Sequence, residues 1–230
     1  MNIFFEGNDN EIFENSEYIL FYADNSDKVL CDSITKEFVY SNNIYSDTSF
    51  YFLTFNQSDG KRISSRNSVD DFSYSIESSN ELFIYENDVN NILKSGREWV
   101  GELFSNGDFQ EFNIASSDIY NKNISIVLRA LSRSTDNSKF IISVNDKNIG
   151  ELNLENIDEE LYGDKGIFST DTFSFEIDDL KKLNVKITYS GSSKSLAYLD
   201  YLIVNYDNKL VYNSGQKSFI NFDALDYNKI

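Results

Sequence analysis

Residues 124–130 read Ile-Ser-Ile-Val-Leu-Arg-Ala, and residues 172–177 read Thr-Phe-Ser-Phe-Glu-Ile. In both stretches every second residue is apolar, starting with Ile124 in the first and Phe173 in the second. Successive side chains of a β-strand point to opposite faces of its sheet. This alternation therefore predicts strands that pack one face on a core and expose the other face to water.

Runs of similar length, rich in β-favouring residues, predict the other strands. They lie at residues 3–5, 18–22, 50–55, 72–76, 81–86, 109–114, 139–144, 147–154, 184–189, 197–205 and 218–222. Cys31 is interpreted as a strand residue as well, and the polar residues 145–148 predict a hairpin turn between two of the runs. The whole pattern is typical of a mostly antiparallel β-sandwich.

One short helix is expected at residues 88–96, because Asp88 is a suitable N-cap and Gly96 a suitable C-terminal residue. This helix would divide the chain into a small N-terminal β region, residues 1–95, and a β-sandwich, residues 96–230. The sandwich is expected to be jelly-roll-like or galactose-binding-like. We therefore expect an all-β fold with two regions and one short helix between them.

Composition excludes several classes of function. The 230 residues are 40% apolar and 25% charged, which is typical of a globular protein. The net charge of −18 argues against nucleic-acid binding, because such a chain repels phosphates. Histidine is absent and Cys31 is the single cysteine, which excludes catalysis by histidine and an internal disulfide. We expect no enzymatic activity in this chain, no cofactor and no transmembrane segment, since no apolar run reaches about 20 residues.

Acidic and amide side chains crowd residues 7–17, and Asp9, Glu11 and Glu17 are the candidates there for binding a cation such as calcium. The EF-hand pattern is not met, because the position that requires glycine holds a large apolar residue. A solvated β-turn accounts for the same composition. We therefore expect no metal at this segment.

Three segments carry a resemblance to known proteins. Residues 11–22 run from an acidic turn into a strand that ends in Phe-Tyr, and residues 43–54 are followed by Gly-Lys-Arg-Ile at 60–63. Residues 95–102 read Ser-Gly-Arg-Glu-Trp-Val-Gly-Glu. Together they resemble gingipain-like cysteine peptidases, and within that family the sortases of the type IX secretion system. The third segment is the most specific, with Val100 in place of a phenylalanine.

The resemblance implies a role for this chain that is not catalytic. The full-length sortases carry a caspase-like peptidase domain with a Cys-His dyad, after the region that this chain resembles. They remove a C-terminal sorting domain from secreted cargo and help attach the cargo at the cell surface. No catalytic residue carries over, because the chain lacks histidine. The implied partners are the peptidase domain of the same polypeptide and other secretion components, in an exported protein at the outer membrane or cell surface.

The segment at residues 95–102 also supplies the candidate binding residues. Trp99 is the only tryptophan and follows the expected helix, so it would anchor the junction of the two β regions, with Arg97 and Glu98 pairing nearby. The alternative is a ligand site made of Arg97, Glu98, Trp99 and Glu102. Asp200 is a further candidate, either buried and paired or exposed.

Other functions stay open at this point. Aromatic residues make up 15% of the chain, and exposed rings on a sandwich can stack on sugars, so a carbohydrate-binding module of an exported protein is the main alternative. A hydrolase that uses two carboxylates is a further alternative. The sandwich is also expected to continue past residue 230, which would leave a strand edge or an apolar groove uncovered.

Overall fold

The computed structural model describes residues 2–7, 12–54, 60–65, 67, 72, 74–116, 118–158, 163–212, 214–215 and 217–226. Within this part of the chain the structure consists of strands and loops, with one 3-10 turn, η1 (Asp223–Asp226). The strands of both large sheets pair antiparallel throughout. The prediction of a mostly antiparallel all-β fold is confirmed.

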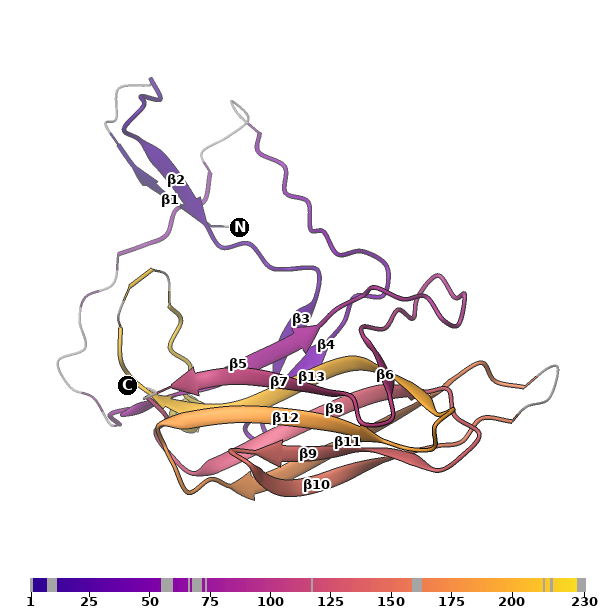
Figure 1. The fold of residues 1–230 in the computed structure, drawn as a ribbon. Helices are drawn as coiled ribbons and strands as arrows, with labels where there is room; N and C mark the ends of the chain where they lie inside the picture. The colour runs from indigo at the N-terminus through magenta and orange to yellow at the C-terminus, as the bar shows by residue number, and fades with distance from the viewer. Residues whose placement is uncertain are drawn as a thin grey trace.

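Two stacked sheets form a sandwich (Figure 1). The four-stranded sheet has the order β10-β9-β12-β7, with β7 (Phe109–Ser116), β9 (Ser138–Val144), β10 (Lys147–Leu154) and β12 (Lys182–Ser190). The five-stranded sheet has the order β11-β8-β13-β5, with β5 (Ser78–Glu86), β8 (Asn123–Ser132), β11 (Ile167–Glu176) and β13 (Leu196–Lys209), and β6 (Leu103–Ser105) pairs with the start of β13. After β6 the chain alternates between the sheets, save for the β9–β10 hairpin. This is the connectivity of a jelly roll.

The core lies between the two sheets and is built from the alternating residues that the sequence singled out. Ile126 and Leu128 of β8 are fully buried in it. Phe140 stacks between Phe104 and Tyr189, with ring centroids 5.1 and 5.2 Å away. The period-two pattern thus identified the inward-facing side of the strands correctly.

The predicted hairpin at residues 145–148 is also confirmed, since it joins β9 to β10. Asn145 and Asp146 both have positive φ angles, 48° and 68°. A type I′ turn requires this conformation at its two central residues, and asparagine and aspartate tolerate it better than most residues do.

Two hairpins precede the sandwich. In the first, β1 (Ile3–Glu6) pairs with β2 (Tyr18–Phe21), and in Figure 1 this hairpin stands away from the sandwich. In the second, β3 (Lys28–Asp32) pairs with β4 (Glu37–Ser41), and Cys31 is a strand residue as expected. The second hairpin is tied to β13, because the amide side chain of Asn205 bonds both the N–H and the C=O of Phe38, at 2.9 and 3.2 Å.

The predicted helix at residues 88–96 is wrong. Asn90 and Val100 exchange two backbone hydrogen bonds of 2.8 and 2.9 Å, which draw the segment into a loop that closes on itself. Lys94 adopts a positive φ of 51°, which a right-handed helix does not allow. Ile92 and Leu93 still bury their apolar side chains, but against Val100. A helix of two turns is marginal on its own, so these tertiary contacts decide the conformation.

Three of the predicted strands are absent. The described parts of residues 50–55 and 72–76 form no strand, and neither do residues 218–222. The last segment forms no ladder with β5: it accepts one backbone hydrogen bond, from the N–H of Asn80 to the carbonyl of Ile220 at 2.6 Å. Its own N–H groups donate to side chains, that of Ile220 to Ser79 Oγ at 3.0 Å and that of Phe222 to Asn80 Oδ1 at 2.8 Å. Conversely, β4 and β6 were not predicted.

The division of the chain at residues 95 and 96 stays a prediction. The jelly roll begins at β5, which comes before that boundary and pairs with β13. In the part of the chain that the structure describes, no helix is long and apolar enough to cross a membrane.

Candidate functional site

The outer face of the five-stranded sheet holds the candidate sites. The loop at residues 88–100 covers one end of this face, where Val100 packs with Leu131 and Tyr198. The β3–β4 hairpin and the segment around Phe222 approach the other end, where Phe38 and Phe222 stack with ring centroids 4.8 Å apart. The two ends differ in chemistry.

At the first end a β-bulge in β13 aims a carboxylate at an arginine. The pairing of β13 with β8 shifts register between Leu199 and Tyr201, so Asp200 is the extra residue. Its Oδ2 lies 2.5 Å from Nη1 of Arg129, and the residue is 4% exposed. Burial raises the pKa of Asp200 to about 6, and the neighbouring Arg129 limits the rise. Asp200 is thus buried and paired, one of the two states that the sequence left open.

The same arginine holds the covering loop. Nη2 of Arg129 lies 3.4 Å from Oε2 of Glu98, and its guanidinium carbon lies 3.8 Å from the centre of the Phe168 ring. Two of the candidates, Glu98 and Asp200, are therefore brought together by a residue that the sequence did not single out. This arrangement fastens the loop to the sheet with charge pairs and a cation–π contact.

Arg97 and Trp99 lie elsewhere, along a cavity of about 270 Å³ that residues 42–47 also line. The Arg97 guanidinium stacks over the Tyr45 ring at 5.5 Å and makes no ion pair with Glu98 in the described structure. Trp99 is 42% exposed, so it is not a core residue, and its role as an anchor between the two β regions stays a prediction. A binding role for Arg97 and Trp99 stays a prediction.

Glu102 occupies a third place. It accepts hydrogen bonds from the hydroxyl of Tyr85 and the amide of Asn87, and so links the motif to the end of β5. The neighbouring Gly101 donates its N–H to the carbonyl of Leu199 at 2.7 Å. A Cβ at Gly101 would lie 3.1 Å from that carbonyl oxygen and 3.0 Å from the carbonyl oxygen of Asn87, so the close approach explains the glycine.

Of the three candidate metal ligands, Asp9 and Glu11 lie outside the described residues. The carboxylate of Glu17 accepts the N–H of Glu14 at 2.9 Å. Among the residues that the structure describes, no cluster of three acidic or cysteine side chains is arranged to hold a metal ion. A metal role for Glu17 therefore has no support from neighbouring ligands in the described structure.

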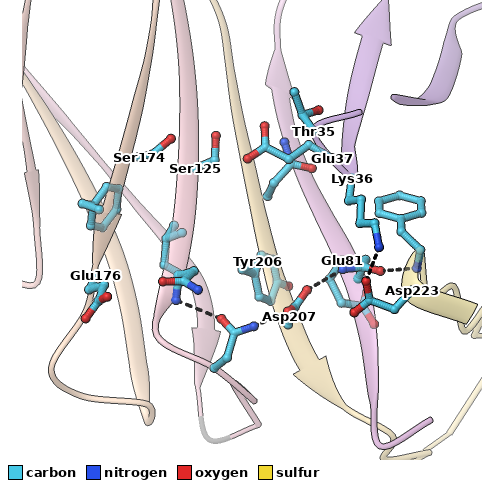
Figure 2. Close-up of a pocket in the computed structure, with 17 residues that line it drawn as sticks. Thr35, Lys36, Glu37, Glu81, Ser125, Ser174, Glu176, Tyr206, Asp207 and Asp223 are labelled. Carbon is cyan, nitrogen blue, oxygen red and sulfur yellow. Dashed lines mark hydrogen bonds and ion pairs between the residues drawn. The ribbon is translucent and has the colours of Figure 1, made fainter. Parts of the chain in front are cut away.

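The second end of the outer face carries a cavity of about 470 Å³ that the sequence did not predict (Figure 2). We call it the polar groove, and define it by Glu37, Ser125, Ser174, Glu176, Asn205 and Asp223. Its floor is the sheet formed by β11, β8 and β13. The β3–β4 turn overhangs it, and η1 borders it.

Three polar residues form the floor of the polar groove. Ser174 of β11, Ser125 of β8 and Asn205 of β13 lie directly opposite one another across the sheet. Ser125 is 4% exposed, and its hydroxyl has no hydrogen-bond partner among the described residues. The Asn205 amide is engaged with Phe38, so Ser125 is the unsatisfied group of the floor.

The rim of the polar groove is acidic. Nζ of Lys36 lies 2.5 Å from Oδ1 of Asp223 and 3.5 Å from Oδ2 of Asp226, so its charge is balanced within the protein. The side chains of Glu37 and Glu176 make no hydrogen bond or ion pair in the part of the chain that is described. The groove therefore presents carboxylates and a hydroxyl that have no partner among the residues that the structure describes.

Sequence reasoning missed this site for a clear reason. Ser125 and Ser174 occupy the polar positions of the two alternating stretches, and the pattern assigns such positions to the wet face of a sheet. The only available signal was that these positions hold small polar residues rather than charged ones. Knowing that they face each other requires the strand register, and knowing that they are covered requires the position of the β3–β4 turn.

No protein-family profile matches the chain, and the curated proteins contain no match. Among solved structures, the CBM36-1 domain of a multidomain xylanase from the hindgut metagenome of Trinervitermes trinervoides shares 12% identity over 59% of this chain and 100% of that domain, with a TM-score of 0.36. A family 35 carbohydrate binding module from Clostridium thermocellum shares 14% identity over 54% of this chain and 90% of that module, with a TM-score of 0.31.

A much fuller similarity joins the chain to latent PorU from Porphyromonas gingivalis, whose crystal structure is dimeric. The two share 18% identity, and the match covers 92% of this chain with a TM-score of 0.74. The chain spans 20% of the length of that PorU chain. The fold of this chain is therefore similar to that of a region of PorU.

Proposed function

We propose that this chain is the non-catalytic structural and interaction region of a type IX secretion sortase, a protein that processes the C-terminal sorting domain of secreted cargo at the outer membrane. The observation that carries the proposal is the match to PorU over 92% of the chain. The motif at residues 95–102 supports it, because Glu98 and Gly101 fasten this segment to the sheet.

In this proposal, bond cleavage belongs to a peptidase domain of the same polypeptide. The chain has no histidine that would activate Cys31, and Cys31 is exposed on β3. The region would orient the peptidase domain and contact other secretion components. The full-length protein would be exported and held at the outer membrane or cell surface.

The test is the composition of the native polypeptide. An antibody raised against this chain is used to isolate the protein from the cells that express it, and the band is sequenced by mass spectrometry. We expect one polypeptide with a mass much larger than the 26.5 kDa of this chain, and peptides from a domain that contains a Cys-His dyad. A native polypeptide that contains these residues and no peptidase domain would contradict the proposal.

A carbohydrate-binding module is the second candidate, and one observation favours it. Trp99 is partly exposed beside Arg97, along the cavity of about 270 Å³. An exposed indole beside polar groups offers a platform for a sugar ring. A glycan array probed with the wild-type chain and with Trp99→Ala tests this role: binding that Trp99→Ala abolishes supports it, and binding that both proteins share does not.

A further inference from the structure

The polar groove has a marked excess of negative charge. One basic residue lines it, Lys36, and its ammonium group is already balanced by Asp223 and Asp226. Five acidic residues line it as well: Glu37, Glu81, Glu176, Asp207 and Asp223. Nζ of Lys217 lies 3.5 Å from Oε1 of Glu81, and the amides of Asn80 and Asn121 donate to Asp207, so Glu37 and Glu176 carry the uncompensated charge. An opening of this kind attracts cations and repels anions.

Its floor has unused hydrogen-bonding capacity. The Ser125 hydroxyl is buried and has no partner among the described residues, and such a group costs free energy until a partner reaches it. Figure 2 shows the hydroxyls of Ser125 and Ser174 side by side on neighbouring strands, pointing the same way. A ligand that lies on this floor can therefore meet two hydroxyls at once.

The groove also offers enough room for a small ligand. Phe175 and Tyr206 line it, but their rings pack against the core between the sheets, so polar groups carry the recognition. The volume of about 470 Å³ lies within the usual range of small-ligand sites and far exceeds the volume of one water molecule.

We propose that the polar groove binds a guanidinium group, supplied by an arginine side chain of a partner polypeptide. Guanidinium is a planar fork with five N–H donors and a permanent positive charge. It matches a site whose free groups are carboxylates at the rim, Glu37 and Glu176, and a buried hydroxyl on the floor. The Lys36 ammonium cannot serve as this cation without leaving Asp223.

Other ligand classes fit less well. A neutral sugar would leave the excess charge of the rim uncompensated, and a phosphate group or another anion would be repelled. A metal ion needs converging carboxylates, and no such cluster exists within the described residues. The proposal rests on the proposed function, because it names the chemistry by which such a region would contact a partner.

The test is a titration of the ¹⁵N-labelled chain, followed by NMR, with two capped tripeptides. One is acetyl-Gly-Arg-Gly-amide, and the other carries citrulline, which has nearly the same shape and no charge. We expect the arginine peptide to shift the backbone resonances of Ser125 and Ser174. The citrulline peptide should bind with an affinity lower by a factor of about ten or more, since each charge-assisted hydrogen bond is worth about that factor. Added salt should weaken the binding of the arginine peptide alone.

Matched variants locate the site. Glu37→Gln removes one charge at the rim, and Glu155→Gln removes one charge from an exposed residue that does not line the groove. We expect Glu37→Gln to weaken binding of the arginine peptide about tenfold, and Glu155→Gln to leave it nearly unchanged. Ser125→Ala removes a hydroxyl that no described residue uses, so the fold should persist while binding weakens. Circular dichroism checks the folding of each variant.

Several results would overturn the proposal. These are equal affinity for the arginine and citrulline peptides, equal effects of Glu37→Gln and Glu155→Gln, and no shift at Ser125 with saturating arginine peptide. Shifts at Ser125 with maltotriose or calcium chloride, and none with the arginine peptide, would assign the groove to another ligand. Each of these results leaves the test of the native polypeptide unaffected, so the failure of one proposal can be told from the failure of the other.

Discussion

The sandwich and the N-terminal hairpins have similar residues and different surroundings. Phe140 of the sandwich has no exposed surface, whereas Phe52, in the segment after the second hairpin, is 92% exposed. The β1–β2 hairpin also leaves Leu20 and Phe21 exposed. An apolar strand is stabilised when a second layer covers it, and a two-stranded hairpin without one is marginal in water. The comparison shows that the layer above a strand, more than its composition, determines its packing.

The β3–β4 hairpin is intermediate between these extremes. Its Phe38 and Tyr40 pack on Phe222 and Tyr201, while Val29 and Val39 remain exposed. The polar groove lies where this hairpin meets the sandwich. The relative stabilities of the two regions therefore bear directly on the proposed binding site.

The largest contrast is expected from two phenylalanine truncations. Phe140→Ala removes a ring that stacks on Phe104 and Tyr189, and should cost about 3–5 kcal/mol of unfolding free energy. Phe52→Ala should change it by less than about 0.5 kcal/mol. Urea unfolding followed by fluorescence measures both changes. Equal costs would show that the two regions are packed alike.

A smaller loss is expected at the bulge in β13. Arg129→Ala leaves the carboxylate of Asp200 buried without its partner, and frees Glu98 from the sheet. We expect a cost of about 2–3 kcal/mol, less than for a fully buried pair, because Arg129 is partly exposed. Arg129→Ala combined with Asp200→Asn should recover part of the loss. A double variant as unstable as the single one would contradict the role given to the buried charge.

Detaching the hairpin should cost less again. Asn205→Ala removes both hydrogen bonds to the backbone of Phe38, with an expected cost of about 1–2 kcal/mol. Hydrogen exchange should become faster at the amide of Phe38, while amides of β9 and β12 keep their protection. Uniformly faster exchange across both sheets would mean that the hairpin is an integral part of the sandwich.

The smallest effect concerns pH, at the contact between the hairpin and β5. The Tyr40 hydroxyl lies between the carboxyl groups of Glu86 and Asp27. Burial raises the pKa of Glu86 to about 7, and the negative charges of Asp88 and Asp27 add to the rise. This value lies above the unfolded-state pKa of about 4.3, so the folded state holds the extra proton and stability falls as pH rises from about 4.5 to 7.

Glu86→Gln replaces the titrating carboxyl with an amide that is neutral at every pH. It should reduce the decrease in unfolding free energy between low and high pH by less than about 1 kcal/mol, because the carboxyl is only half-buried. Urea midpoints at pH 5 and pH 8 measure it. Glu155→Gln, which removes the same charge from an exposed site, is the control. If both variants change the fall equally, the effect belongs to the net charge of the chain and not to Glu86.

The sequence predicts the sandwich well, because its strands obey a local rule. Ile124, Ile126 and Leu128 recur at every second position, and Phe173 has a polar residue on each side. This pattern depends only on which side of the strand faces the core. The rule fails where long-range contacts decide the structure. Residues 88–96 carry helix-capping residues, yet the bonds between Asn90 and Val100 prevail over them. The run at 218–222 has strand-like composition, but side chains of β5 accept the N–H groups of Ile220 and Phe222.

The candidate sites were predictable only in part. The motif at 95–102 contains Glu98, but its partner Arg129 lies on the outward side of a strand, where a charged residue needs no explanation. The polar groove brings together Glu37, Ser125 and Asn205, which are far apart along the chain. Their meeting depends on strand register and on the path of a hairpin, and neither is encoded in any one segment.

The pairing of β5 with β13 has a mechanical consequence. Ser78 begins β5 and lies opposite Lys209 at the end of β13, so the chain enters and leaves the jelly roll at neighbouring points. Tension applied to the segments on either side would first load the bonds of Ile220 and Phe222 to β5. It would then load the pairs of β5 and β13 one at a time, beginning with Ser78 and Lys209, and so separate the two strands from that end. A pull along the polypeptide would thus release the first strand well before it disturbed the layers behind it.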